Sequence, residues 1–203
     1  MSEGKRLLVF FGMIAAGKSR LAAAFAKKWE CGYHNSDIVR KELAGLAADS
    51  RQINSIDTGI YSSDFSRRTY DALLSQALND LKQERYTCVV LDGSYQSRSE
   101  RQHLCREVGK QHRLVFVYCQ CPEAVMKKRM DRRLKNPRAV SDGRWEIYLQ
   151  QKKRFEMPVE LPPGQLLTVD TDSPPAELLR LLEENLRKLE DLEPEQKYNG
   201  KSQ

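Results

Sequence analysis

Hydrophobic residues along this 203-residue chain fall into short runs that alternate with segments of helical spacing. We predict that the short apolar runs are strands, at residues 7–11, 32–35, 87–91, 114–119 and 166–169. The segments of helical spacing predict helices at residues 18–29, 37–46, 63–84, 97–110, 122–134, 142–155 and 174–192. Strands that alternate with helices are typical of a parallel sheet covered on both faces. The pattern therefore predicts an α/β protein, with a three-layer α/β/α fold around a five-stranded parallel sheet.

The predicted helix at 63–84 has the clearest spacing, because its apolar residues recur three or four positions apart and form a stripe. This stripe consists of Tyr70, Leu73, Leu74, Ala77, Leu78 and Leu81. We assign it to the hydrophobic core. Ser36 is the predicted N-cap of the helix at 37–46, and a polar stretch follows that helix at 47–60.

Residues 1–192 are expected to form one domain, because no repeat or long linker divides them. Residues 193–203 are polar, and we expect this tail to be disordered. Lys and Arg outnumber Asp and Glu by 34 to 28, which gives a net charge of +6. A modest positive charge suits phosphorylated ligands and nucleic acid alike, so the charge does not choose between these partners.

The five cysteines are an odd number, and Cys88, Cys119 and Cys121 lie in apolar runs. We interpret them as reduced thiols in the core, which favours a cytoplasmic location. Cys119 and Cys121 are spaced like a pair of metal ligands, but no matching cluster of histidine or cysteine follows them.

A complete G-x-x-x-x-G-K-S sequence stands between the first predicted strand and the first predicted helix. Successive backbone N–H groups that enter a helix N-terminus form a cradle for anions, and here they predict a phosphate-binding loop. The residues predicted to bind nucleotide are Gly12, Met13, Ala15, Ala16, Gly17, Lys18 and Ser19. Lys18 is expected to reach the β- and γ-phosphates, and Ser19 is expected to bind Mg²⁺. The loop therefore predicts ATP and Mg²⁺ as cofactors.

The N-terminus also resembles a secretory signal, because Lys5 and Arg6 precede an apolar stretch at 7–16 that ends in small residues. We reject this interpretation, since cleavage there would cut the phosphate loop and a strand followed by that loop explains the same residues. No other stretch approaches the roughly 18 apolar residues of a membrane span, so we expect no membrane partner.

Asp92 follows the apolar strand at 87–91 and is the predicted second metal-binding residue. A carboxylate at the carboxyl end of a strand beside the phosphate loop holds Mg²⁺ through water in nucleotide-binding proteins of this kind. Apolar runs that end in aspartate are common, and the alternative is a capping aspartate in a turn. The phosphate loop earlier in the chain favours the metal site.

Asp37 and Arg40 begin the helix after the second predicted strand, three residues apart and therefore on one face of that helix. Ligands bind at the carboxyl ends of strands in such folds. Asp37 is a candidate base for an attacking hydroxyl, and Arg40 is a candidate to hold the acceptor or a transferring phosphate. The alternative is a capping aspartate with an arginine on the helix surface.

Arg129 and Arg133 lie four residues apart on the predicted helix at 122–134, so their side chains share one face. Two such arginines can close over the phosphates and neutralise the charge of the transition state. We therefore predict a helical arginine lid, with a solvated basic surface as the alternative.

Together these residues resemble the small P-loop kinases, and most closely a group of predicted kinases among the AAA-type P-loop ATPases, related to zeta-toxin and polynucleotide 5′-hydroxyl kinases. The resemblance rests on the phosphate loop at 12–19, on segments 35–41, 67–74, 89–95, 121–123, 140–142 and 169–172, and on Tyr61, Arg98, Arg101, Arg129, Arg133, Gln151, Phe155 and Glu156. It spans nearly the whole chain.

The resemblance implies that Asp37 is the base for the acceptor hydroxyl, with Arg40 beside it, and that Arg129 and Arg133 are the lid arginines. It also implies that Thr171 borders the adenine. One difference concerns the phosphate loop, where many relatives have Pro-Gly-Ser and this chain has Ile14, Ala15 and Ala16. A position with positive φ in that loop would have to be managed without glycine.

We therefore predict an ATP- and Mg²⁺-dependent kinase that transfers the γ-phosphate to a hydroxyl of a small molecule. No Asn/Thr-Lys-x-Asp sequence occurs, which favours adenine over guanine. A polynucleotide 5′-hydroxyl kinase is the nearest alternative; Arg67, Arg68, Arg98 and Arg101 support it, but no series of aromatic residues for base stacking accompanies them.

Two further alternatives are an ATP-dependent switch without a small acceptor, and a toxin kinase that acts on a cell-wall sugar nucleotide. The sequence leaves the acceptor and the oligomeric state open.

Overall fold

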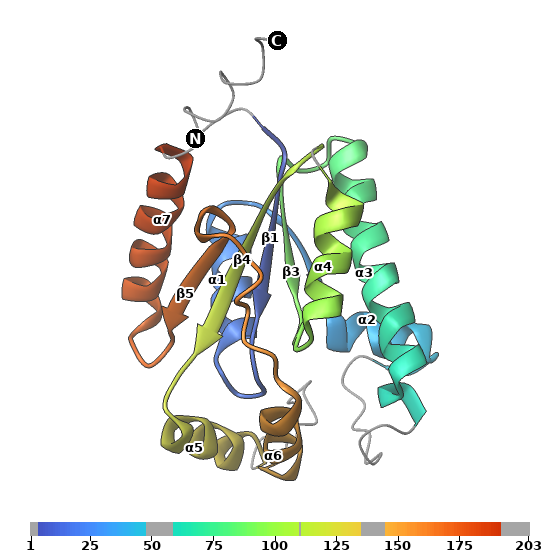
Figure 1. Cartoon of the computed structure of the whole chain (residues 1–203), viewed down its shortest axis with the longest axis vertical. Helices are drawn as coiled ribbons and strands as arrows, with labels where there is room; N and C mark the ends of the chain where they lie inside the picture. Colours follow the sequence, from blue (N-terminus) through green and yellow to red (C-terminus); the bar gives the residue numbers. More distant parts are fainter. Residues whose placement is uncertain (1–3, 48–58, 110, 135–144, 192–203) are drawn as a thin grey trace.

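The computed structural model describes residues 4–47, 59–109, 111–134 and 145–191. Its five strands form one sheet (Figure 1) and are β1 (Arg6–Phe11), β2 (Gly32–Asn35), β3 (Cys88–Asp92), β4 (Arg113–Gln120) and β5 (Leu166–Asp170). The strand order is β2-β3-β1-β4-β5, and every neighbouring pair is parallel. The predicted five-stranded parallel sheet is confirmed.

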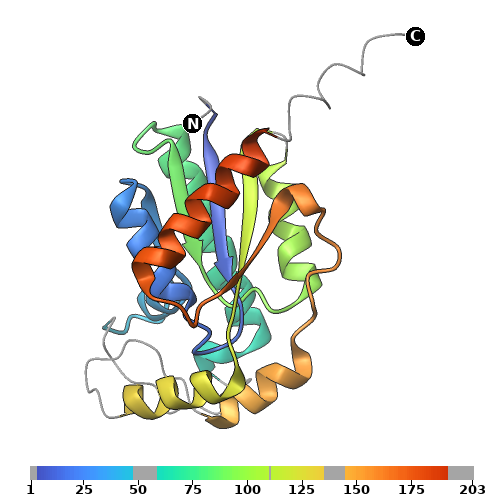
Figure 2. The same cartoon turned by 90° about the vertical axis from the view of Figure 1, so that its left-hand side faces the viewer.

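Helices cover both faces of the sheet. They are α1 (Lys18–Lys28), α2 (Ser36–Leu43), α3 (Ser63–Lys82), α4 (Arg98–Val108), α5 (Glu123–Leu134), α6 (Trp145–Arg154) and α7 (Pro175–Asp191), with single 3₁₀ turns at η1 (Gly59–Tyr61) and η2 (Pro163–Gln165). Helices α1 and α7 lie on one face and α3 and α4 on the other, whereas α5 and α6 lie beyond the carboxyl ends of the strands (Figures 1 and 2). The predicted three-layer α/β/α fold is confirmed.

The central strand β1 is apolar at every position after Arg6, because both of its faces are buried. Leu7, Val9 and Phe11 pack into the core on the side of α3 and α4. Leu8 and Phe10 pack into the core on the side of α1 and α7. The predicted stripe on α3 enters the first of these cores, with Leu78 at its edge.

One predicted helix start is wrong, because Asn35 and not Ser36 is the N-cap of α2. The Asn35 Oδ1 accepts hydrogen bonds from the backbone N–H groups of Asp37 (2.9 Å) and Ile38 (3.1 Å). An asparagine at the end of a strand has the extended backbone and the side-chain oxygen that an N-cap needs. Ser36 is therefore the first helical residue.

Parts of the predicted polar stretch at 47–60, all of the segment 140–142 and the predicted tail at 193–203 lie outside the described residues. None of the helices within the described ranges has the length and apolar character needed to cross a membrane. The five cysteines are free thiols, of which Cys31, Cys119 and Cys121 are buried.

Candidate active site

A cleft of about 730 Å³ lies at the carboxyl ends of β1, β2 and β3. Five of the predicted site residues line it, namely Lys18, Ser19, Asp37, Arg40 and Asp92. They come from three segments of the chain and meet because β3 lies between β1 and β2 in the sheet. The structure therefore brings together the phosphate loop, the candidate base and the candidate metal-binding carboxylate.

Two glycines are required by the shape of the phosphate loop. Gly12 has φ 139°, and a Cβ placed on it would lie 2.3 Å from the carbonyl oxygen of Cys119 on β4. Gly17 has φ 86° and is the N-cap of α1, where it has no side chain to offer. The first N–H groups of α1 have no partner within the helix, and this leaves them available to an anion.

Ala15 occupies the left-handed region with φ 61°, which is uncommon for a residue other than glycine. The sequence predicts that a positive φ in this loop has to be managed without glycine, and Ala15 is the residue that does so. The Ala15 methyl group is almost completely buried in a small cluster with Ile14, Met126 and Tyr148, which joins the loop to α5 and α6. Packing of this methyl group therefore offsets part of the backbone strain that alanine introduces.

Asp92 is fully buried at the end of β3. Its Oδ2 accepts hydrogen bonds from the Tyr33 hydroxyl (2.8 Å) and from Asn35 Nδ2 (2.5 Å). Burial and the neighbouring Asp92 carboxylate raise the pKa of Tyr33, so its hydroxyl stays protonated and donates. The Oδ1 of Asp92 is buried and has no partner among the described residues.

Such an orphaned carboxylate oxygen beside the phosphate loop fits a Mg²⁺ site that uses few protein ligands. Magnesium keeps several waters and binds through one or two protein oxygens together with substrate phosphates. Accordingly, the described residues contain no cluster of three or more His, Cys, Asp or Glu side chains that could enclose a metal. Ser19 and Asp92 are the residues that would hold the ion.

Asp37 lies in the first turn of α2, and its carboxylate makes no hydrogen bond within the described part of the chain. Burial raises the pKa of Asp37, while the positive charges of Lys18 and Arg40 oppose the rise. A carboxylate with free lone pairs and a raised pKa in a cleft has the properties of a general base.

Arg40 is buried beside Asp37, but protein groups hold it firmly. Its Nη1 donates to the carbonyl oxygen of Ile60 (2.7 Å) and to the Ser66 hydroxyl (3.1 Å). Its guanidinium also lies over the Tyr61 ring, 5.2 Å from the centroid. The Arg40 Nε is buried without a partner among the described residues, so one donor of this arginine stays uncommitted.

Arg129 and Thr171 lie together behind the phosphate loop. Arg129 Nη2 donates to the Thr171 carbonyl oxygen (2.6 Å), and its Nη1 donates to the Ala15 carbonyl oxygen (3.3 Å). The Thr171 hydroxyl donates to the carbonyl oxygen of Ala16 (2.6 Å). Arg129 thus contacts the carbonyl side of the loop. Arg133 is in the last turn of α5, and its side chain lies outside the described part of the structure.

Residues 7–158 match a family model described as an AAA domain, which is most of the chain. The chain belongs to this AAA domain family. The predicted relation to AAA-type P-loop proteins is thereby confirmed. A search of curated proteins with this chain found no match.

Solved structures share the fold of this AAA domain at low sequence identity. A gluconokinase from Sinorhizobium meliloti is 22% identical with a TM-score of 0.63, over 95% of this chain and 97% of that one. Shikimate kinase from Aquifex aeolicus is 16% identical with a TM-score of 0.55, over 93% and 99%. Kti12 from Chaetomium thermophilum, in complex with ADP-AlF3, is 16% identical with a TM-score of 0.60, over 88% and 97%. The domain therefore has the fold of small P-loop kinases.

Sequence reasoning assigned no role to three residues at or beside the cleft of this AAA domain. Tyr33 and Asn35 hold Asp92, and Gln151 on α6 contacts the phosphate loop. Tyr33 and Asn35 are two residues apart on one strand, so alternation places both side chains on the same face of the sheet. This spacing is a sequence signal that could have revealed them. The Gln151 contact depends on where α6 packs, and no local pattern reveals it.

Arg101, which the polynucleotide kinase alternative invoked, is not available to a ligand. Its side chain is fully buried and donates to Glu160 (2.6 Å) and to the carbonyl oxygens of Tyr95 and Glu156 (both 2.9 Å). These bonds tie α4 to the segment that precedes β5. The role of Arg101 in this AAA domain is structural.

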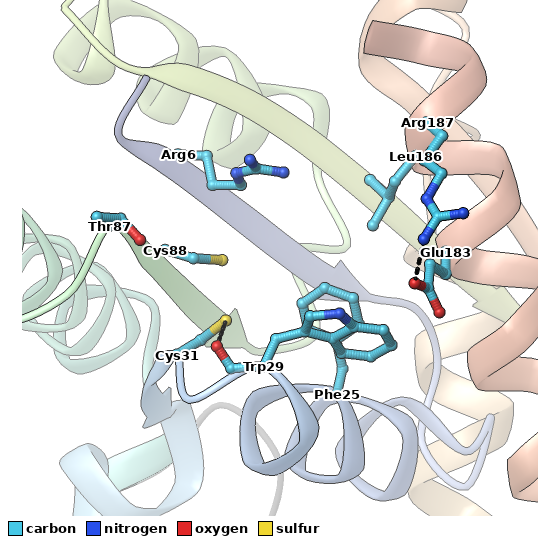
Figure 3. Close-up of a pocket in the computed structure, with 9 residues that line it drawn as sticks. All are labelled: Arg6, Phe25, Trp29, Cys31, Thr87, Cys88, Glu183, Leu186 and Arg187. Carbon is cyan, nitrogen blue, oxygen red and sulfur yellow. Dashed lines mark hydrogen bonds and ion pairs between the residues drawn. The ribbon is translucent and has the colours of Figure 1, made fainter. Parts of the chain in front are cut away.

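A second and smaller cavity of about 70 Å³ lies near the amino ends of β1 and β3, where Arg6 and Cys88 begin those strands (Figure 3). Phe25 and Trp29 of the α1 end and Leu186 of α7 form its apolar wall. It contains none of the predicted site residues of the AAA domain.

Proposed function

We propose that this chain is an ATP- and Mg²⁺-dependent kinase that transfers the γ-phosphate of ATP to a hydroxyl of a small molecule. One observation carries the proposal: the Asp37 carboxylate shares a cleft with Lys18 and Asp92 and has no hydrogen-bond partner among the described residues. A switch that only senses nucleotide needs no base in front of its phosphate loop.

The oxygen of the acceptor hydroxyl attacks the γ-phosphorus. Asp37 accepts the proton that this hydroxyl loses. The bond from that phosphorus to the bridging oxygen breaks, and ADP leaves. Lys18 and the free N–H groups of the phosphate loop neutralise charge on the phosphates. Ser19 and Asp92 would hold Mg²⁺, which would supply further charge neutralisation for the phosphates.

Thr171 is proposed to border the adenine, and Arg129 and Arg133 are proposed as the two arginines of the lid. Their support is the adjacency of Arg129 and Thr171 at the loop. Gly12, Met13, Ala15, Ala16 and Gly17 are proposed to bind phosphate through the loop backbone.

The acceptor side of the cleft is mostly polar, which suits a hydroxylated small molecule. Its lining there includes Ser63, Ser66, Arg67, Asp71, Ser94, Gln96 and Ser99. The gluconokinase and shikimate kinase among the structural neighbours support the same acceptor class. We propose Arg40 as the residue that holds the acceptor, because it lines the cleft together with Asp37.

We also propose that residues 1–192 act as one domain and that the kinase works in the cytoplasm. Five free cysteines in one chain suit a reducing compartment.

An acceptor screen tests the proposal. ATP consumption would be measured with sugars, sugar acids, nucleosides, sugar nucleotides and 5′-hydroxyl oligonucleotides, with the Asp37→Asn protein as control. We expect a small hydroxylated compound to be consumed by the wild-type protein and not by Asp37→Asn. Transfer to oligonucleotides alone would favour the polynucleotide kinase, and acceptor-independent hydrolysis that Asp37→Asn leaves intact would favour the switch.

A further inference from the structure

Gln151 of α6 is bonded directly to the phosphate loop. The backbone N–H of Ile14 donates to Gln151 Oε1 over 2.8 Å, and both residues line the cleft together with Lys18 and Asp37. A backbone N–H can only donate, so the atom that faces it must be the oxygen of the carboxamide. The two N–H groups of the Gln151 side chain therefore belong to its other arm, on Nε2.

Gln151 Nε2 donates to no residue in the described part of the chain. Because Oε1 and Nε2 are bonded to the same carbon, this free donor also lies beside the phosphate loop. The oxygen of the carboxamide is therefore bonded to the protein, whereas its NH₂ group remains available to a ligand in the cleft.

Helix α6 is seated so that this carboxamide is held in place. Tyr148 lies one helical turn before Gln151, is almost fully buried, and packs in one cluster with Ile14 and Ala15 of the loop. The Tyr148 hydroxyl donates to Glu123 of α5 over 2.8 Å. A donor fixed before the reaction costs no reorganisation when charge develops, which is what makes such donors effective.

We propose that Gln151 is a catalytic residue that donates a hydrogen bond from Nε2 to the phosphoryl group in transfer, while the Ile14 N–H holds Oε1. The phosphoryl group passes between Lys18 and Asp37 in this same cleft. Its equatorial oxygens carry the charge that a neutral N–H donor stabilises. The inference rests on the proposed kinase function and adds a residue to it.

The test compares binding of ADP with binding of ADP plus Mg²⁺ and aluminium fluoride, a mimic of the transferred phosphoryl group, by calorimetry. For Gln151→Ala we expect unchanged affinity for ADP and a loss on the order of 10²-fold in affinity for the aluminium fluoride complex. In the acceptor assay kcat should fall by a similar factor while KM for ATP stays the same. Lys153→Ala, at an exposed position of α6 outside the cleft, is the matched control.

The variant Gln151→Glu distinguishes the role of the carboxamide oxygen as an acceptor from the role of its NH₂ group as a donor. A carboxylate still accepts from the Ile14 N–H but has no donor, so this variant should lose as much as Gln151→Ala. Recovery of aluminium fluoride binding in Gln151→Glu would overturn the proposal, since the contact to Ile14 alone would then suffice. Equal weakening of both complexes in Gln151→Ala would also overturn it, because that result indicates support of the loop only.

The two proposals fail differently. A wild-type protein that binds neither ADP nor ATP contradicts the kinase itself. A wild-type protein that binds and transfers, with Gln151 variants that behave like it, contradicts only the role of Gln151.

Discussion

Asp37 combines a base-like position with a pKa that burial raises above the ordinary aspartate value, although Lys18 and Arg40 oppose the rise. A base works only when it is ionised, so kcat/KM should fall as the pH drops through this raised pKa. We predict a pH–rate profile whose acid limb has its midpoint above the pKa range of an exposed aspartate.

Asp37→Asn checks this assignment. We expect kcat to fall on the order of 10²- to 10⁴-fold with ADP affinity retained, and the acid limb to disappear from the pH–rate profile. A profile for Asp37→Asn that keeps the same limb would assign the titration to another group.

Ala15 carries a left-handed backbone and a buried methyl group at once. Gly at this position would relieve strain of about 1 kcal/mol. The glycine variant would also lose about 0.8 kcal/mol from burial of the methyl group. The greater entropy of glycine in the unfolded chain would lower the stability further. We predict that Ala15→Gly changes the free energy of unfolding by less than about 1 kcal/mol, because these terms largely cancel.

Ala15→Val should lower the free energy of unfolding by more than about 2 kcal/mol, because a β-branched residue strains at positive φ and overfills the cluster. Denaturant titration of both variants measures the two effects. Equal stabilities for the Gly and Val variants would contradict the observed backbone at Ala15.

The role of a residue can be predicted from the sequence when its partners are close to it along the chain. Lys18, Ser19 and Asp92 could be assigned from the chain alone, since a motif or a strand end fixes where they lie. Arg101 could not, because its role is set by Glu160, which is 59 residues away. Gln151 and Ile14 are 137 residues apart, and only packing joins them.

At the scale of elements, Asn35 connects β2, α2 and β3. It caps α2 through Oδ1 and supports Asp92 through Nδ2. We predict that Asn35→Ala lowers the free energy of unfolding by about 1–2 kcal/mol through loss of the cap. It should also raise the Mg²⁺ concentration needed for half-maximal activity, because Asp92 loses a donor.

Asn35→Ser is the matched variant, since serine caps a helix but cannot reach Asp92 in the same way. We expect near-normal stability with the same shift in the Mg²⁺ requirement. Thermal unfolding and a Mg²⁺ titration of the kinase measure the two effects separately. A normal Mg²⁺ requirement in both variants would mean that Nδ2 is dispensable for Asp92.

The centres of the elements could be predicted from periodicity, but their ends could not. Helix α2 ends at Leu43 and not at residue 46, because the chain turns at Gly45, with φ 68°. Strand β4 extends to Gln120, where its register with β5 continues to Asp170. Such ends are set by caps and by pairing with neighbouring strands, which hydrophobic spacing does not encode.

At the scale of the whole molecule, the strand order decides which predicted residues meet. The parallel pairing of β3 with both β1 and β2 sets Asp92 beside Phe10 and Asn35. The sequence predicts parallel strands with their ligand-binding ends at one edge. It does not predict that order, because the order depends on which helices cover which face.

Arg101 and Glu160 connect α4 to the segment between α6 and β5 across the molecule. Burial alone would raise the pKa of Glu160, but the hydrogen bonds from Arg101 hold this pKa below its ordinary value. A carboxyl group with a lowered pKa in the folded chain adds stability above its unfolded pKa, and that stability is lost as the pH falls through the lowered value.

We predict that Arg101→Leu lowers the free energy of unfolding by about 3–5 kcal/mol near pH 7, because Glu160 loses its buried partner and keeps only the exposed Arg98, at 3.7 Å. The loss should shrink as the pH falls and Glu160 becomes protonated. Denaturant titrations across pH, with the exposed Arg106→Leu as control, measure this dependence. A loss that is independent of pH would show that packing, and not the ion pair, stabilises this contact.

The two tryptophans lie in different parts of the molecule, Trp29 beside the small cavity at the amino ends of the strands and Trp145 on α6, where it stacks on Tyr148 at a centroid distance of 4.7 Å. Their fluorescence can therefore be assigned. With Trp29 replaced by phenylalanine, all indole emission comes from Trp145 on α6, and its change on nucleotide addition reports whether the surroundings of this end of α6 respond to a ligand at the phosphate loop.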